Sequence, residues 1–368
     1  MAQKKLIIFM PSIEGGGVEK NLFKISNFLS KNIKNISIIT ASIKYKRKFL
    51  NKIEFLHPLS HFWDKLGRGY KYFICLIILI RQIFEEKNLV VFSFQANIYC
   101  IILCKLFGVK VIVRSNSSPS GWSKNFLKSF IFKNVLKSAD LIIVNSVEFK
   151  KELKNKFNVK AKYIYNPLNL QEIKKLSKEK ININFFKEKN ILKLINVSRF
   201  TDQKDHFTLL KSINILKKKI PLKLLIIGRG INKNKMKTYI KENSLEKIVK
   251  IINFQKNPIK FIKNSDIFVL SSTFEGLPNV LLEAMTIKKY IISSNCPTGP
   301  KEILQKGKFG SLFKVGNQND LAKKITEYYS NKKFLLKKVE LGYKSLERFD
   351  QKINLNKYLY EIKKFLTL

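Results

Sequence analysis

The chain has 368 residues, 45% of them hydrophobic, and a formal net charge of +45. Its length exceeds what one hydrophobic core usually supports, so we expect two domains. The charge indicates an anionic partner (nucleic acid, a phospholipid surface or a pyrophosphate-bearing substrate), but no helix-turn-helix, zinc-finger or RNA-binding pattern occurs, which argues against the common nucleic-acid-binding classes.

Lysine, asparagine, isoleucine and phenylalanine are abundant along the whole chain, so part of the charge reflects a general drift in composition. The remainder favours a membrane surface over a nucleic acid. The four cysteines show neither metal-site spacing nor a disulfide framework, which indicates a reducing compartment. The apolar run at 73–80 is interrupted by Arg81 and Gln82, so we expect a core helix there and no membrane span.

The first strand and glycine-rich turn lie at the amino terminus. Residues 6–10 form an apolar run that predicts a buried strand and is too short for a signal peptide. Gly15, Gly16 and Gly17 follow, and apolar residues then recur at helical spacing over 18–29. Strand, glycine run and helix together predict a βα unit whose loop can admit a phosphate. A flexible turn without a ligand is the alternative.

The rest of the first half alternates short apolar runs with helical periods. This alternation is typical of βαβ units, and it predicts a parallel sheet covered by helices on both faces. Only a possible strand, at 53–56, is expected in the less regular stretch 46–63. The expected strands are 36–40, 89–94, 109–113, 141–145 and 162–165.

A polar, turn-rich segment at 114–122 follows the strand expected at 109–113. The carboxyl ends of strands are where ligands of open α/β sheets bind, so Arg114 and Asn116 are candidate binding residues. An ordinary capping loop is the alternative for Asn116.

The join between the two halves is expected near Asn166 and Pro167. Proline disfavours helix at the preceding residue, and residues 171–190, rich in Lys, Glu and Asn, are expected to form an interdomain linker. The second half repeats the alternation of the first. Its expected strands are 192–197, 224–227, 248–254, 267–270 and 290–294.

Two basic residues, Arg199 and Lys204, follow the strand expected at 192–197. An arginine at a strand end and a lysine at a helix start put two positive charges where a diphosphate can accept them. In a chain with 71 lysines and arginines, an ordinary surface pair is the alternative.

Two glutamates, Glu275 and Glu283, flank a turn and a helix start after the strand expected at 267–270. The turn contains Gly276 and Pro278. A carboxylate at a strand end, a glycine that permits close backbone approach and a helix amino terminus suit a polar, anionic ligand. A loop charge and a solvated helix residue are the alternative.

Five separated motifs make the chain resemble the family-4 retaining glycosyltransferases, which have the GT-B fold. The resemblance implies an α/β protein of two facing Rossmann-like domains with a cleft between them. It implies an acceptor-side domain at 1–168, a nucleotide-sugar domain at 169–350 and a helix at 351–368 that returns to the first domain. The motifs are Gly-Gly-Val-Glu at 16–19, Tyr-Asn-Pro at 165–167, Val-Ser-Arg-Phe-x-x-x-Lys at 197–204, Glu-x7-Glu at 275–283 and Gly-Pro-x-Glu-Ile-Leu at 299–304.

The same resemblance implies roles for individual residues. One set of residues is catalytic: it would stabilise the leaving diphosphate and face the donor sugar. A second set would bind the rest of the donor, and a third set would lie on the acceptor side. The catalytic residues are Arg199, Lys204 and Glu275; the donor-binding residues are Gly16, Gly17, Gly276, Leu277, Pro278, Asn279 and Glu283; the acceptor-side residues are Arg114 and Asn116.

The implied activity is transfer of a hexose or N-acetylhexosamine, with retention, from a UDP-sugar to a lipid-linked or surface-polysaccharide acceptor, as in lipopolysaccharide synthesis. A polyprenyl-diphosphate acceptor and an anionic membrane surface are the expected partners, with no nucleic acid. The expected location is cytoplasmic, peripheral at the inner face of the cell membrane. No Asp-x-Asp follows a strand, so we expect no metal and no other cofactor.

Readings from other classes remain open. One is a non-catalytic basic protein that binds membranes or nucleic acid on a GT-B scaffold. The other is an epimerase or a phosphorylase-like enzyme of the same general architecture, although no lysine context for pyridoxal binding is found.

Overall fold

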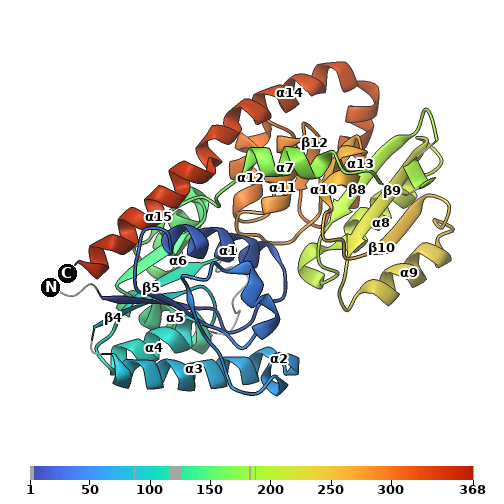
Figure 1. The fold of residues 1–368 in the computed structure, drawn as a ribbon. Coiled ribbons are helices and arrows are strands. Elements are labelled where there is room, and N and C mark those ends of the chain that lie inside the picture. Colours follow the sequence, from blue (N-terminus) through green and yellow to red (C-terminus); the bar gives the residue numbers. More distant parts are fainter. Residues whose placement is uncertain (1–3, 87, 117–125, 182–183, 187, 368) are drawn as a thin grey trace. The chain divides into compact units, whose positions relative to one another are not determined.

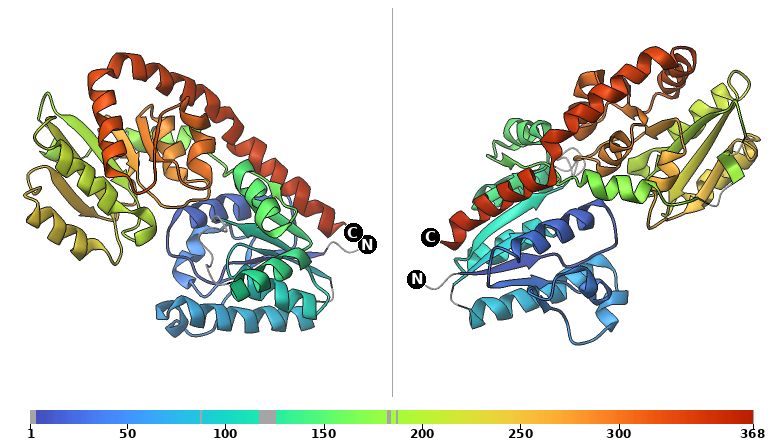
Figure 2. Two further views of the ribbon diagram at one scale, coloured as in Figure 1. Left: turned by 180° about the vertical axis from the view of Figure 1, so that it is seen from behind. Right: turned by 45° about the horizontal axis from the view of Figure 1, so that its top comes forward.

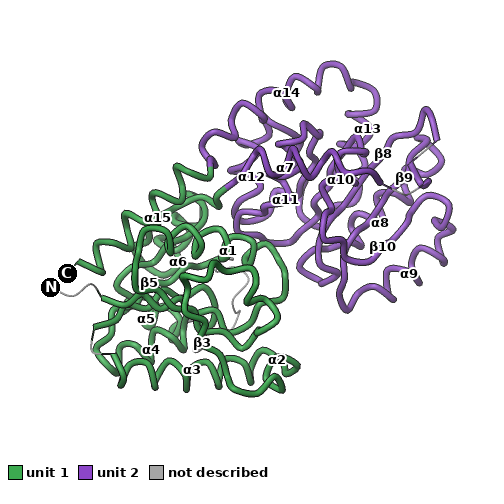
Figure 3. Tube along the Cα trace, in the orientation of Figure 1, with its two compact units in different colours: residues 1–167, 351–368 green, residues 168–350 purple. Residues whose placement is uncertain are grey.

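The computed structural model describes residues 4–86, 88–116, 126–181, 184–186 and 188–367. The chain divides into two compact units (Figure 3). One consists of residues 1–167 and 351–368, and the other of residues 168–350.

The first unit is built on a parallel sheet with the order β3-β2-β1-β4-β5-β6-β7 in the described part of the chain. The predicted strands are confirmed, including the one proposed at 53–56, although several ends shift by one or two residues. The strands are β1 (Lys5–Phe9), β2 (Ile36–Ile39), β3 (Glu54–Leu56), β4 (Leu89–Ser93), β5 (Lys110–Ser115), β6 (Leu141–Val144) and β7 (Lys162–Tyr163).

Helices cover both faces of this sheet (Figures 1 and 2). Successive side chains of a strand point to opposite faces, so an apolar run puts apolar side chains on both faces, and both need to be covered. Leu6 and Ile8 pack with α1 and α15, whereas Ile7 and Phe9 pack with α3, α4 and α6. Apolar runs without alternation are therefore what this sheet requires. The helices are α1 (Gly17–Leu29), α2 (Phe62–Lys65), α3 (Arg68–Glu85), α4 (Asn97–Leu106), α5 (Phe126–Ser138), α6 (Val147–Phe157) and α15 (Gln351–Leu366).

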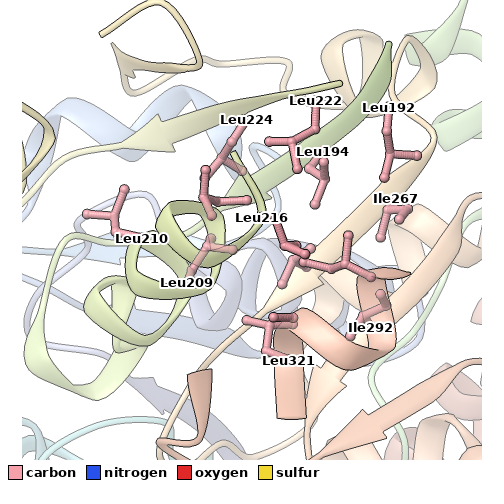
Figure 4. Close-up of a cluster of buried hydrophobic side chains, with 14 of the residues drawn as sticks. Leu192, Leu194, Leu209, Leu210, Leu216, Leu222, Leu224, Ile267, Ile292 and Leu321 are labelled. Carbon is pink, nitrogen blue, oxygen red and sulfur yellow. The ribbon is translucent and has the colours of Figure 1, made fainter. Parts of the chain in front are cut away.

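The second unit has a parallel sheet with the order β10-β9-β8-β11-β12-β13. Leucines and isoleucines from its strands meet those of α8 and α13 in one core (Figure 4). The strands are β8 (Leu192–Val197), β9 (Leu222–Gly228), β10 (Val249–Asn253), β11 (Ile267–Leu270), β12 (Tyr290–Ser294) and β13 (Ser311–Phe313). The helices are α7 (Leu170–Ser177), α8 (His206–Leu216), α9 (Lys233–Glu242), α10 (Ile259–Lys263), α11 (Asn279–Thr286), α12 (Gly299–Ile303), α13 (Gln318–Ser330) and α14 (Lys332–Lys344).

The linker expected at 171–190 is wrong in part, because most of helix α7 lies inside it. The Asn169 side chain caps this helix by accepting a hydrogen bond from the Glu172 N–H at 3.0 Å. Ile173 is buried, and α7 packs against α10 and α11. Leu170, Ile173 and Leu176 recur at helical spacing, but the helix is short and lies in a segment rich in Lys, Glu and Asn, whose composition favoured a linker.

The core helix expected at 73–80 is confirmed, and one side of it belongs to the core. Cys75 and Leu79 of α3 are buried, whereas Phe73 is 63% and Ile77 is 44% exposed. The helix is apolar on its inner and its outer side. Among the described residues, no helix combines the length and the apolar character that crossing a bilayer requires.

Candidate active site

The candidate site lies in the second unit, at the carboxyl edge of its sheet. Strands β8 and β11 are neighbours there, and both run in the same direction. The loop 198–205 after β8 and the loop 271–278 after β11 therefore leave the sheet at the same edge. This is the edge where ligands of open α/β sheets bind.

Lys204 and Glu275 form an ion pair at this edge. The Lys204 Nζ donates to Glu275 Oε1 at 2.5 Å, and the Ser272 hydroxyl donates to the same oxygen at 2.6 Å. The side chains of Lys204 and Glu275 are only 13% and 8% exposed. A carboxylate removed from water to this degree requires such partners, so each charge holds the other in place.

Hydrogen bonds to backbone carbonyls join the two loops around this pair. The Thr273 N–H donates to the Gln203 carbonyl at 2.8 Å, and the Gln203 side-chain amide donates to the Phe274 carbonyl at 2.9 Å. The Ser271 hydroxyl donates to the Lys204 carbonyl at 2.9 Å. The basic loop 198–205 and the acidic loop 271–278, which were predicted separately from the sequence, are thus held together by hydrogen bonds.

A third loop, after β12, fixes the position of Glu275. The Glu275 N–H donates to the Pro297 carbonyl at 2.5 Å, and the Thr298 N–H donates to the Glu275 carbonyl at 3.2 Å. A Cβ at Gly299 would lie 2.0 Å from the Gly276 carbonyl oxygen. Only glycine fits at position 299, which gives the predicted 299–304 motif a physical reason that its sequence did not reveal.

Arg199 lies in the same loop as Lys204 but differs from it in exposure and in pairing. It is exposed, and no side-chain partner of its guanidinium occurs among the described residues. The edge therefore offers one cation that is already paired with a carboxylate and one that is available to an incoming anion. A guanidinium suits this task because its planar fork matches two phosphate oxygens.

The predicted donor-binding residues of this unit surround the start of α11. Gly276 and Leu277 precede the helix, Pro278 is its N-cap, and Asn279 is its first residue. Proline has no amide hydrogen, so the N–H groups at this turn are those of its neighbours. Glu283 lies one turn into the helix and is buried.

The predicted glycines Gly16 and Gly17 belong to the first unit. Gly16 is the N-cap of α1 and Gly17 its first residue. The Glu19 carboxylate accepts a hydrogen bond from the Glu14 N–H at 3.2 Å, and a Cβ at Gly16 would lie 2.9 Å from Glu19 Oε2. The glutamate of the Gly-Gly-Val-Glu motif thus holds the loop in shape, a role that we did not predict.

Arg114 is fully buried in the first unit, which its sequence context did not indicate. Its Nε donates to the Tyr358 hydroxyl at 2.8 Å, and its Nη2 donates to Asn166 Oδ1 at 2.7 Å. The first bond ties β5 to α15, and the second ties β5 to the segment after β7. Asn116 donates to the Phe94 carbonyl at 3.2 Å. The acceptor-side role of Arg114 and Asn116 stays a prediction, and residues 117–122 of that segment lie outside the described residues.

Comparison with known proteins relates the second unit to a family of glycosyltransferases. Residues 177–345, which contain the whole candidate site, match the family model described as glycosyl transferases group 1. This segment of the chain is therefore similar to that family. It is 28% identical over 337 residues to an N-acetylgalactosaminyltransferase of Campylobacter jejuni, which the name describes as acting on N-acetylgalactosamine-N,N'-diacetylbacillosaminyl-diphospho-undecaprenol; the match covers 86% of this chain and 88% of that protein.

Two further matches complete the comparison. An uncharacterized glycosyltransferase of Methanocaldococcus jannaschii is 48% identical over 82 residues, which cover 22% of this chain and only 20% of that protein. The crystal structure of Anabaena HepE in complex with UDP superposes with a TM-score of 0.77 at 15% identity, covering 98% of this chain and 100% of that one. The predicted GT-B fold is confirmed.

A buried histidine supports the basic loop of this glycosyltransferase. The Ser198 hydroxyl donates to Asn196 Oδ1 at 2.8 Å, so it accepts from His206 Nε2 at 2.9 Å. His206 Nδ1 is buried and has no partner among the described residues. Burial, and secondarily the charge of Lys204, lower the pKa of His206 to about 4. His206 is therefore a neutral structural residue and not a surface one.

The stability of the glycosyltransferase should depend on this histidine in mild acid. In the unfolded chain His206 has its ordinary pKa near 6.5. Between about pH 6.5 and pH 4 it therefore binds a proton in the unfolded chain but not in the folded protein. The free energy of unfolding should be level above about pH 6.5 and fall as the pH approaches 4. The expected loss between about pH 7 and pH 5 is about 2 kcal/mol. Urea unfolding measured at several pH values should show that the free energy of unfolding depends less on pH in His206→Gln than in the wild type.

A cysteine beside the candidate site is an inert thiol. Cys296 is buried, and this burial, together with the negative charge of Glu275, raises its pKa to about 12. A neutral thiol is a poor nucleophile. Cys296 is therefore unsuited to covalent catalysis at neutral pH.

Proposed function

We propose that the protein transfers a hexose or N-acetylhexosamine from a UDP-sugar to a lipid-linked or surface-polysaccharide acceptor, with retention at the anomeric carbon. The observation that carries this proposal is the Lys204–Glu275 pair beside the exposed Arg199 at the carboxyl edge of the second sheet. The UDP in the HepE complex and the undecaprenol-linked acceptor named for the Campylobacter relative support the choice of donor and acceptor.

Each part of the site has a proposed task. Arg199 and Lys204 stabilise the negative charge that develops on the leaving diphosphate, which is where most of the rate enhancement arises. Glu275 and the backbone of 276–279 contact the donor sugar, and Glu283 holds the ribose. The glycine loop of the first unit approaches the pyrophosphate.

The chemistry we propose uses no covalent intermediate. The acceptor oxygen attacks the anomeric carbon on the face that the diphosphate leaves, and the departing phosphate oxygen takes the acceptor proton. The bond to the diphosphate breaks as the new glycosidic bond forms. Arg114 and Asn116 are the proposed acceptor-side residues of the first unit.

The proposed partners are a nucleotide sugar, a polyprenyl-diphosphate-linked glycan and an anionic membrane surface, with no nucleic acid. The proposed location is the cytoplasmic face of the cell membrane, where the protein binds peripherally. Support comes from the net charge of +45 and from the diphospho-undecaprenol in the name of the Campylobacter relative.

A donor panel tests the proposal directly. UDP- and GDP-linked sugars are incubated with polyprenyl-linked acceptors, and release of nucleoside diphosphate is measured. Transfer from a UDP-sugar, with a product of the same anomeric configuration as the donor by NMR, is expected. An inverted product would contradict retention, and no release from any donor would favour a non-catalytic basic binding protein.

Transfer should also proceed without a divalent cation. Two positive side chains, Arg199 and Lys204, offer the charge compensation that a metal ion would otherwise supply to a leaving diphosphate. Among the described residues, no group of three His, Cys, Asp or Glu side chains forms a possible metal site. Initial rates in EDTA and in added magnesium should agree within about twofold. A rate that collapses in EDTA and returns with magnesium would contradict this prediction.

A further inference from the structure

An apolar surface covers the outer side of α3 and α4 in the first unit. On α3 the exposed apolar residues fall at helical spacing on the side opposite the buried Cys75 and Leu79. On α4 they repeat this arrangement opposite the buried Cys100 and Cys104. We name this surface the α3–α4 face; it consists of Tyr70, Phe73, Ile77, Phe84, Tyr99, Ile102, Leu106 and Phe107.

The α3–α4 face is continuous. Helices α3 and α4 pack against each other along one side of the unit (Figure 1). The rings of Phe84 and Phe107 meet edge to face, with centroids 5.4 Å apart, and so join the two helices. Helix α5 packs beside α4 and adds the exposed Phe130 and Ile131. A surface helix of a globular protein is normally polar on its outer side, so a face of this kind indicates an interaction surface.

The charge of the chain identifies the partner. The basic residues of α3 and α4 are each paired with a carboxylate (Arg68 with Glu14, Lys71 with Asp64, Arg81 with Glu85 and Lys105 with Asp140). The positive charge beside the face therefore comes from Lys133 and Lys137 of α5 and from the net charge of +45 of the whole chain. Exposed aromatic rings beside lysine and arginine suit the headgroup region of a bilayer with anionic lipids. A second copy of this chain is a poor partner, because each copy carries a net charge of +45 and the two repel.

The α3–α4 face also reaches the substrate edge of its unit. Arg68, the first residue of α3, donates its Nε hydrogen to Glu14 Oε1 at 2.6 Å, and its Nη2 contacts Glu14 Oε2. Glu14 immediately precedes the glycine loop 15–17 after β1. The amino-terminal end of the apolar stripe therefore lies beside the loop that we assign to the donor pyrophosphate.

We propose that the α3–α4 face docks the protein on an anionic phospholipid bilayer, with its aromatic side chains in the headgroup region. Its closeness to the glycine loop then presents the carboxyl edge of the first sheet to acceptors held in that bilayer. This second step rests on the proposed transfer to a lipid-linked acceptor. The docking itself does not.

Vesicle sedimentation tests the docking. The full chain is mixed with vesicles of phosphatidylcholine alone or of phosphatidylcholine with phosphatidylglycerol, at low and at high salt. Binding to the anionic vesicles is expected, with weakening at high salt. The double substitution Phe73→Asp with Ile77→Asp should weaken this binding by about tenfold or more, because it places two charges in the apolar stripe.

A matched control comes from α14 in the second unit. Phe334 is 68% and Leu341 is 53% exposed on a lysine-rich helix, so Phe334→Asp with Leu341→Asp makes the same chemical change elsewhere. This control should bind anionic vesicles as the wild type does. Circular dichroism and thermal melts establish that both double variants are folded, and the single Phe84→Asp near the end of α3 provides a second test if the first variant is not.

The outcomes separate the two proposals. Equal binding to neutral and anionic vesicles, or equal loss in the face variant and the control, would overturn docking by the α3–α4 face. Concentration-dependent dimers that the face variant abolishes, with unchanged vesicle binding, would assign the face to a second copy instead. Vesicle binding that depends on the face, in a protein that releases no nucleoside diphosphate from any donor, would sustain the docking and reject the proposed function.

Discussion

Replacing Glu275 with alanine is expected to reduce transfer by about two orders of magnitude or more. The carboxylate contacts Lys204 and Ser272 and lies in the turn that leads into α11. Its loss removes a proposed contact to the donor sugar and leaves the largely buried Lys204 without its partner. Breaking a buried pair in this way also costs about 3–5 kcal/mol of stability, so the variant should melt at a lower temperature.

The catalytic and structural effects of Glu275 can be separated. Glu275→Gln keeps a hydrogen-bond acceptor near Lys204 and Ser272, so it should fold better than Glu275→Ala while still lacking the charge. In a double-mutant cycle with Lys204→Met, the losses in kcat/KM should be far from additive, because the two side chains act as one pair. The exposed Glu246→Ala serves as the control and should transfer at the wild-type rate. Near-normal transfer by Glu275→Gln and Glu275→Ala would remove Glu275 from the site.

The strands of both sheets were predictable because a parallel sheet buried on both faces demands continuous apolar runs. Residues 6–10 and 267–270 carry this signal clearly. The strand β13, Ser311–Phe313, was not predicted, since three residues at a sheet edge give too short a run to be distinguished from a loop. Helix α7 was missed because polar residues dominate it. Local pattern therefore defines an element only when most of its length is buried.

The candidate site was predictable to the extent that chemistry follows strand ends. Lys204 and Glu275 each come after a strand, and the adjacency of β8 and β11 brings them together. The bonds of Gln203 to the loop of Glu275, and the fit of Gly299 against Gly276, are long-range contacts that no local pattern contains. The burial of Arg114 likewise depends on α15, which lies far away in sequence.

Arg199 is expected to have a large effect of a different kind. Because Arg199 is exposed and has no side-chain partner among the described residues, Arg199→Ala should leave the melting temperature unchanged. If its guanidinium stabilises charge that develops on the leaving diphosphate, kcat should fall by about two orders of magnitude or more, while KM for the donor changes much less. Purified variants assayed over a range of donor concentrations provide both constants.

Two further arginine variants make this prediction specific. Arg199→Lys keeps the charge but loses the planar fork, so it should recover only part of the lost rate. Arg229, also exposed, follows the neighbouring strand β9 and stacks on Phe254 at 4.9 Å, and Arg229→Ala should transfer nearly as well as the wild type. An equal loss in both alanine variants would mean that the charge of the whole edge matters and not the position of Arg199. A rise in KM for the donor with kcat unchanged would assign Arg199 to donor binding in the ground state. Loss of an interaction made only in the transition state would instead lower kcat.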